Sequence, residues 1–166
     1  MQVLFTVRAY TSILRECIFY PETESGGILI GKRTGGSNFV VVFAIGSGPR
    51  AVRSPTRFTP DVSWQQKILE RLFNLYAVNY IGSFHRHPWY DQWPSSLDFK
   101  TARKIISSPE WNIHEAVFPI ILISSQGIQI YPYFLSRDSN GFKQVPWRIV
   151  LDCSEIIKTV LHRSTK

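Results

Sequence analysis

Two cysteines and one methionine are present among the 166 residues, and no apolar run approaches the roughly 18 residues of a membrane-spanning helix. Cys17 and Cys153 lie far apart in the sequence and form no C-x-x-C pair, which favours a reduced cytosolic protein over a disulfide-stapled scaffold. The first ten residues are too short and too polar for a secretory signal peptide. We therefore expect a soluble, cytoplasmic protein without a membrane partner.

Acidic residues are scarce: 12 Asp and Glu stand against 19 Lys and Arg, a net charge of +7. Arg50, Arg53 and Arg57 follow one another with no acid between them. A basic surface can attract nucleic acid or an acidic protein, or simply remain solvated. No RNP-like motif, zinc-finger spacing or basic helix is present, so nucleic-acid binding is not expected. The 44% apolar and 14% aromatic content excludes a disordered chain.

Apolar periodicity predicts alternating strands and helices. Strands are expected at 3–7, 26–32, 38–45, 79–87, 117–125 and 127–135, and helices at 9–19, 60–76, 96–107 and 152–162. Residues 46–60 are expected to form an irregular loop, followed by a helix with Thr59 as its N-cap and Pro60 at its first position. The predicted buried residues of this helix are Trp64, Ile68, Leu72 and Leu75. The pattern predicts an α/β fold with a mixed sheet, in a single domain spanning 1–166.

The stretch FHRHPWYDQWPSSLD, residues 84–98, concentrates groups that can bind a metal. On a strand, His85 and His87 point to the same face about 6.6 Å apart along it, while Arg86 points to the other face. Asp98 falls in the first turn of the next predicted helix, which can return its carboxylate to the end of the strand. Two imidazoles and a carboxylate leave a fourth tetrahedral position for water, which is typical of a catalytic zinc site.

Ordinary structural interpretations exist for the same residues. Ser95 and Asp98 form an S-x-x-D pattern that is also a common helix cap, and an isolated H-x-H occurs on many exposed strands. Capping and metal ligation are compatible, because the same helix start can serve both. A hydrolase also needs a general base. Glu22 and Glu24 both precede the glycine-rich strand at 26–32, and their chemistry alone does not choose between them.

These residues resemble the signature of the JAB/MPN zinc metallopeptidases, also called JAMM proteases. HRHPWYDQWPSSLD fits H-x-H-x7-S-x-x-D, and ESGGILIG at 24–31 fits the upstream element E-x-x-G-x-L-x-G. The second match selects Glu24 and leaves Glu22 out of register. The segments at 48–54 and 58–61 are similar to compact prokaryotic members. The resemblance covers about 1–135, and 136–166 is a C-terminal extension of unassigned role.

The resemblance implies a barrel-like mixed sheet flanked by helices, in a cytidine-deaminase-like arrangement. It implies that His85, His87 and Asp98 bind Zn²⁺, that Glu24 moves the proton of the attacking water, and that Ser95 stabilises the oxyanion. The implied activity is cleavage after the C-terminal glycine of a ubiquitin-like protein, either to deconjugate it or to mature its precursor. Some relatives act beside E1- and E2-like enzymes in bacterial antiviral conjugation systems, which are therefore expected partners.

Four further residues are predicted by analogy to contact the substrate: Arg53, Arg86, Trp89 and Trp93. For the two tryptophans, anchoring of the loop is an equal alternative. Arg86 stands where relatives commonly have Ser or Thr. Cys17, His114 and His162 are expected to be structural or surface residues. Two other functions stay open, namely a non-catalytic MPN scaffold and a JAB-type hydrolase of another carrier protein or a peptide-like metabolite.

Overall fold

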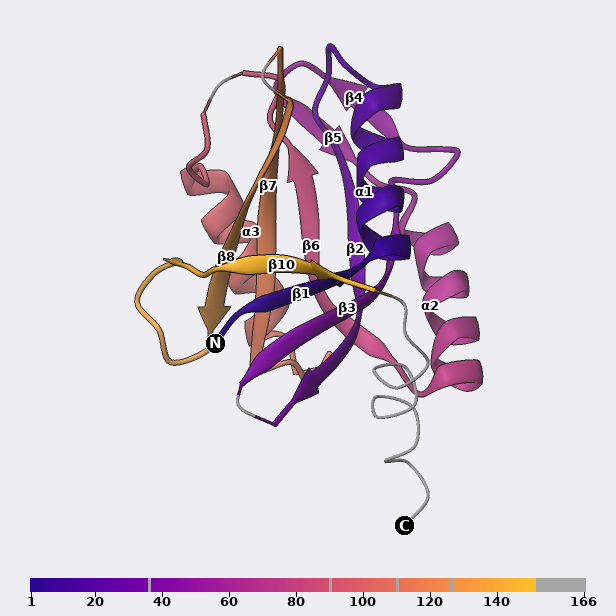
Figure 1. Ribbon diagram of the computed structural model, residues 1–166, viewed down its shortest axis with the longest axis vertical. Helices are drawn as coiled ribbons and strands as arrows, with labels where there is room; N and C mark the ends of the chain where they lie inside the picture. The colour runs from indigo at the N-terminus through magenta and orange to yellow at the C-terminus, as the bar shows by residue number, and fades with distance from the viewer. Residues whose placement is uncertain (36, 90, 110, 126, 152–166) are drawn as a thin grey trace.

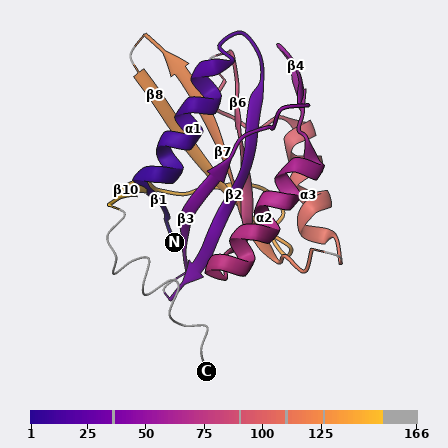
Figure 2. The same ribbon diagram turned by 90° about the vertical axis from the view of Figure 1, so that its right-hand side faces the viewer.

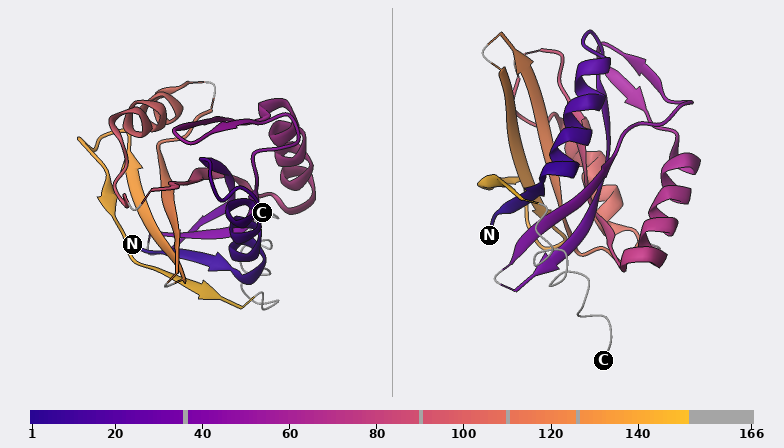
Figure 3. Two further views of the ribbon diagram at one scale, coloured as in Figure 1. Left: turned by 90° about the horizontal axis from the view of Figure 1, so that it is seen from above. Right: turned by 45° about the vertical axis from the view of Figure 1, so that its right-hand side comes forward.

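The computed structural model describes residues 1–151 except 36, 90, 110 and 126. Its main feature is an eight-stranded mixed sheet that curls into a half-barrel (Figures 1 and 3). The sheet order is β10 (Trp147–Val150), β1 (Val3–Thr6), β3 (Asn38–Ile45), β2 (Ser25–Thr34), β6 (Asn79–Arg86), β7 (Glu115–Ser124), β8 (Gly127–Ser136) and β9 (Lys143–Gln144). β6 and β7 run parallel, as do β10, β1 and β3, whereas β2 is antiparallel to both of its neighbours.

The helix α1 (Val7–Phe19) lies inside the curl of the sheet (Figure 3). Its residues Ala9, Ile13 and Cys17 share one face, are fully buried, and join strand residues such as Leu29 and Val41 in the main core. The spacing of these three residues at i, i+4 and i+8 explains why this stretch is a helix with one buried stripe. The core therefore fills the concave side of the sheet.

Two further helices, α2 (Val62–Tyr76) and α3 (Ser96–Ser107), cover the outer face of the sheet (Figures 1 and 2). Ile68 and Leu72 of α2 pack on Ile30 and Val40, which alternate along their strands with the residues that face α1. α3 contributes Ala102 and Ile106 to a separate cluster with residues of β7 and β8. The β4–β5 hairpin lies between the two helices when the molecule is seen from above (Figure 3).

The predicted strands and helices within 1–151 are confirmed within two residues at each end. The prediction of an irregular loop at 46–60 is wrong, because this segment contains a hairpin of β4 (Val52–Ser54) and β5 (Arg57–Thr59). The predicted helix at 152–162 and Cys153 lie outside the described residues. None of the helices in the described part of the chain is both long enough and apolar enough to cross a membrane.

The predicted start of α2 is also wrong. Thr59 pairs with Val52 in the hairpin, and the N-cap is Asp61, whose carboxylate accepts a hydrogen bond from the backbone N–H of Trp64 at 3.2 Å. Leu75, predicted to be buried, is 60% exposed. In the last turn Tyr76 packs on Phe43 of β3 instead, so the stripe that faces the sheet is rotated away from Leu75.

Candidate metal centre

The end of β6 places two histidines side by side. His85 lies opposite Gly26 of β2 and Ile120 of β7, and the N–H of His87 continues the ladder to the carbonyl of Ile121 at 3.1 Å. Because residues 85 and 87 share a face of the strand, their Nε2 atoms approach to 2.8 Å. Both imidazoles thus direct a nitrogen to one point, as the sequence predicted.

The start of α3 brings a carboxylate to the same point. Ser95 is the N-cap, its Oγ accepts from the N–H of Asp98, and the Asp98 carboxylate accepts from the N–H of Ser95 at 2.6 Å. Asp98 Oδ1 lies 3.3 Å from Nε2 of His85, and Oδ2 lies 3.8 Å from Nε2 of His87. The helix cap and the approach of the Asp98 carboxylate to both histidines therefore coexist in one geometry.

The spacing of these three donors suits a metal ion. One ligand atom from each of His85, His87 and Asp98 lies within 4.8 Å of the others. Bonds of about 2.0–2.2 Å in a tetrahedral zinc site separate ligand atoms by roughly 3.3 Å, close to the distances seen here. His87 Nδ1–H donates to the carbonyl of Asp91 at 2.7 Å, which leaves Nε2 with a free lone pair. The group can hold a divalent metal ion with one position left open.

Electrostatics reinforce this arrangement. Burial alone would raise the pKa of Asp98, but hydrogen bonds from His85, His87 and Ser95 outweigh it and hold that pKa well below its usual value. Burial lowers the pKa of His87, yet the Asp98 carboxylate, the Asp91 carbonyl and the charge of Glu24 outweigh it, so the pKa is raised. In the metal-free protein the carboxylate therefore stays ionised while His87 gains affinity for a proton, the competitor of a metal ion.

Glu24 stands immediately before β2 and is half-buried in a cavity that His85 and Asp98 also line. Its backbone N–H donates to the carbonyl of Ser54 at 2.9 Å. Burial raises the pKa of the Glu24 carboxyl, an effect that the two histidines partly offset and Asp98 adds to. A carboxylate with a raised pKa is a stronger general base. Glu22, in contrast, is exposed on the preceding turn, so the structure separates the two glutamates.

A cavity of about 410 Å³ extends from this site across the outer face of the sheet. Pockets that enclose small ligands occupy the same range of volumes. Its walls come from the β4–β5 hairpin, the first turn of α2, and α3, and its floor comes from β6 and β7. The main apolar residues that line it are Ile28, Phe58, Val62, Leu97, Ile105 and Phe118. Sequence reasoning missed these walls, because their periodicity is that of ordinary helix and strand faces.

The two tryptophans predicted to contact substrate are exposed in the loop that joins β6 to α3. Trp89 is 66% exposed and Trp93 is 58% exposed, and the Trp93 ring lies 6.1 Å from that of Tyr133. Such exposure suits a contact surface better than an anchor in the core. Contact with substrate stays a prediction for both.

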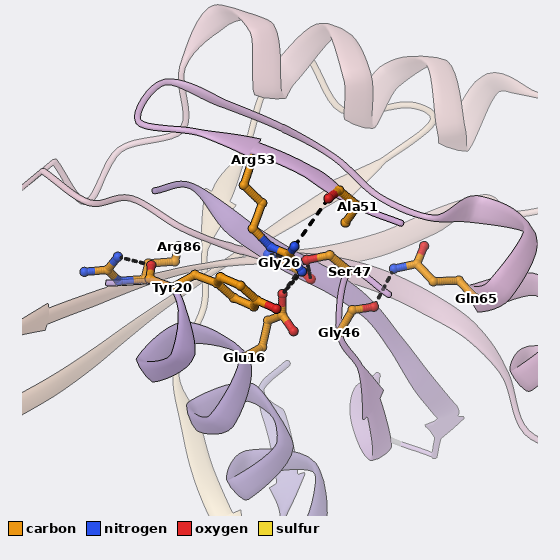
Figure 4. Close-up of polar contacts among 9 residues, drawn as sticks. All are labelled: Glu16, Tyr20, Gly26, Gly46, Ser47, Ala51, Arg53, Gln65 and Arg86. Atoms are coloured by element: carbon orange, nitrogen blue, oxygen red, sulfur yellow. Dashed lines mark hydrogen bonds and ion pairs between the residues drawn. The ribbon is translucent and has the colours of Figure 1, made fainter. Parts of the chain in front are cut away.

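The two arginines predicted to contact substrate contact residues near the end of α1 (Figure 4). The side chain of Arg53 is 12% exposed, pairs with Glu16 at 3.2 Å and stacks on the ring of Tyr20. Arg86 is 4% exposed, and its guanidinium donates to backbone carbonyls at the end of α1. The contacts of both arginines are with other residues of the chain. Direct contact with substrate stays a prediction for both.

The remaining singled-out residues lie apart from the ligand group. His114 is exposed in the loop before β7. Cys17 is fully buried in the core, where burial raises the pKa of its thiol to about 12, with a lowering effect of Arg86 and a raising effect of Glu16. A thiol with so high a pKa is a poor nucleophile, which supports the structural role expected for Cys17.

The chain resembles known proteins in sequence and in fold, although no family model matches it. Over 102 residues the chain is 30% identical to the probable metalloprotease y4qB of Sinorhizobium fredii (strain NBRC 101917 / NGR234). That alignment covers 60% of this chain and 62% of the relative, less than two thirds of its length. It is consistent with a metallopeptidase of the JAB/MPN type.

The second likeness concerns the fold alone. The solution structure of protein DSY2949 from Desulfitobacterium hafniense has a TM-score of 0.69 to this chain at 18% identity. The match covers 93% of this chain and 97% of that protein. The curled mixed sheet with its helices is therefore an arrangement that this chain shares with a solved structure.

Proposed function

We propose that this protein is a zinc-dependent peptidase of the JAB/MPN type. The observation that carries the proposal is the convergence of His85, His87 and Asp98 on one point of a cavity that also contains Glu24. Two histidines, one carboxylate and an open position form the donor set of catalytic zinc sites, and a separate carboxylate is the usual base beside them. The likeness to a probable metalloprotease points to the same chemistry.

The residues of the site have distinct roles in this proposal. Zinc, when bound, supplies the Lewis acidity that activates water and polarises the scissile carbonyl. Glu24 accepts a proton from the attacking water and delivers it to the leaving amine, a task for which its raised pKa is suited. The Ser95 oxygen accepts from the N–H of Asp98, and in this proposal its hydroxyl donates to the developing oxyanion.

We further propose that the substrate is the C-terminal tail of a ubiquitin-like protein, cleaved after its last glycine. The cavity lies between α2 and α3 and has Glu24, His85 and Asp98 in its lining, so an extended chain in it lies beside the site. The neighbouring β4–β5 hairpin is a two-stranded sheet, and an extended tail can pair with its edge. The substrate side of the proposal rests on this shape and on the resemblance of the motifs.

The test combines metal binding with cleavage. Zinc is titrated into chelator-treated protein, and ubiquitin with a short C-terminal extension is then offered to the zinc-loaded and metal-free forms. We expect binding of one zinc ion and cleavage after the terminal glycine by the loaded form alone. Full cleavage by the metal-free form would sink the proposal. Zinc binding without cleavage of this probe would favour a different carrier protein as substrate, and failure to bind zinc would favour a non-catalytic scaffold.

A further inference from the structure

Arg86 lies between the two candidate ligands on β6 and points to the opposite face. Its register partner on β7 is Ile121, a core residue on the α1 side of the sheet, and Arg86 itself is 4% exposed. A guanidinium keeps its charge at all relevant pH values, and burying that charge is unfavourable unless polar groups compensate. The position therefore needs a specific set of acceptors.

Those acceptors are the carbonyls of the turn between α1 and β2. Arg86 Nη1 lies 2.8 Å from the oxygen of Tyr20 (Figure 4). The same nitrogen lies 3.3 Å from the oxygen of Thr23 and also donates to the carbonyl of Pro21. Tyr20 is the C-cap of α1, and the last turn of this helix contains no basic residue. The last carbonyls of a helix lack internal partners and carry partial negative charge. Arg86 thus supplies from β6 the positive charge that α1 lacks at its end.

This turn leads directly to Glu24. Thr23, whose carbonyl faces Arg86, precedes the proposed base, and Ser25 after it pairs with Arg86 itself in the β2–β6 ladder. Gly26, the next residue, pairs with His85. The proposed base therefore lies between two short segments that both contact β6. Residues 20–23 accept hydrogen bonds from the Arg86 guanidinium, and residues 25 and 26 pair with β6 in the sheet.

The same segment is fixed from its other side. Ser47 Oγ donates to the carbonyl of Gly26 at 2.9 Å and also contacts the carboxylate of Glu16 (Figure 4). Arg53 pairs with that carboxylate and stacks on Tyr20. A Cβ on Gly26 would lie 2.3 Å from the carbonyl oxygen of Phe84, so this backbone passes too close to β6 for any side chain. Without Arg86, the turn from Tyr20 to Thr23 would lose its hydrogen bonds to β6. The contacts made by Ser47 and Arg53 on the other side would remain.

We propose that Arg86 is a positioning residue, which fixes the turn at 20–23 and thereby holds the Glu24 carboxylate in the cavity beside His85 and Asp98. This role rests on the proposed function and replaces substrate contact as the task of Arg86. All three carbonyls are contacted by one nitrogen, Nη1, so the ammonium of a lysine could replace part of these contacts.

The test compares Arg86→Met with a matched control, Arg137→Met. Arg137 also reaches across to the end of a helix, donating to the carbonyls of Ile106 in α3 and Ile113 at 3.0 Å and 3.1 Å. Two readouts are needed: hydrogen exchange of the backbone amides of residues 20–26 in the metal-free protein, and zinc affinity with kcat and KM of the zinc-loaded protein on extended ubiquitin.

For Arg86→Met we expect at least tenfold faster exchange at 20–26 and a fall of kcat of about 10- to 100-fold, since misplacing a catalytic group by an ångström has effects of this size. KM and zinc affinity should stay within about threefold, because all three ligands lie on the other side of β6 or on α3. Arg137→Met should leave both readouts unchanged, and millimolar guanidinium should restore part of the activity of the Arg86 variant.

Two outcomes would contradict the proposed role of Arg86. Unchanged exchange and unchanged kcat in Arg86→Met, or equal losses in both variants, would overturn the positioning role. If Arg86→Met does not fold, Arg86→Lys provides the same comparison, with a smaller expected loss of kcat. If even the native protein neither binds zinc nor cleaves the probe, the proposed function fails, and the exchange measurement alone still decides whether Arg86 holds the turn.

Discussion

The proposed site consists of two regions that the chain builds in different ways. His85, His87 and Asp98 come from one continuous strand–loop–helix corner, and much of their geometry follows from strand alternation and a helix cap. Glu24 comes from a turn about sixty residues earlier and is held by partners from β6, β4 and α1. Metal binding should therefore tolerate most changes outside the corner, whereas catalysis should depend on long-range contacts.

The largest expected effect comes from breaking the corner. His85→Ala removes a nitrogen that lies 2.8 Å from His87 and 3.3 Å from Asp98. We expect zinc affinity to fall by more than about 100-fold, because loss of even an outer-shell partner costs 10- to 100-fold, and we expect peptidase activity to disappear. Competition with a chromogenic chelator measures the affinity, and His114→Ala, which changes an exposed histidine outside the group, is the control. Undiminished affinity in His85→Ala would mean that zinc binds elsewhere.

A change at Glu24 alone should separate catalysis from zinc binding. Glu24→Gln keeps the shape of the side chain and removes the base, so we expect kcat to fall by about 10²- to 10⁴-fold. Zinc affinity should change by less than about threefold, because Glu24 is not one of the three converging ligands. Glu22→Gln, on the exposed part of the same turn, is the matched control and should retain full activity. Equal activity of the two variants would remove Glu24 from the mechanism.

Ser95 sharpens the comparison inside the corner, because it caps α3 and is also the proposed oxyanion donor. Ser95→Ala should lower the free energy of unfolding by about 1 kcal/mol through the lost cap and lower kcat by about 10²- to 10³-fold through the lost donor. Ser95→Asp is informative, since aspartate restores a cap without a hydroxyl. Thermal unfolding and kinetics of both variants separate the roles, and recovery of activity in Ser95→Asp would assign the serine to capping only.

The smallest expected effect lies outside both regions, at the N-cap of α2. A hydrogen bond from Arg50, with a smaller contribution from the N–H of Trp64, lowers the pKa of Asp61 against the effect of burial. A carboxyl with a depressed pKa in the folded state stabilises the fold above its unfolded pKa of about 3.9. That contribution is lost as pH falls through the folded pKa.

The variant Asp61→Asn retains a capping side chain and loses the negative charge. Thermal unfolding of this variant and of the native protein is measured as a function of pH. We expect a modest decrease of the midpoint of thermal unfolding at pH 7, and a difference from the native protein that shrinks as pH falls below about 4. Zinc affinity should be unaffected. A pH-independent difference between the two proteins would show that the Arg50 pair contributes nothing to stability.

The contrast between the regions also explains what the sequence could predict. The positions of His85, His87 and Asp98 follow from local rules, namely alternation along a strand and the first turn of a capped helix. Most strands and helices were likewise readable, because α1 has one buried stripe and β2 is a nearly continuous apolar run, whereas β9 and β10 were not predicted. These are interactions between residues close in sequence.

What escaped prediction depends on residues far apart in sequence. The hairpin of β4 and β5 is only three residues per strand and is polar, so its pattern resembles a loop. The role of Asp91 is carried by its backbone carbonyl, which any residue possesses. Arg86 was correctly expected to point away from the histidines, but its acceptors are carbonyls of residues 20–23, and no pairwise motif predicts such contacts.

The most direct test of the metal centre is a crystal structure of zinc-loaded protein with anomalous scattering measured at the zinc edge. The proposal predicts one strong anomalous peak about 2.0–2.2 Å from Nε2 of His85, Nε2 of His87 and a carboxylate oxygen of Asp98. Glu24 should face the remaining coordination position. A peak at other residues, or none under conditions in which zinc is bound in solution, would contradict the assignment of this corner as the metal site.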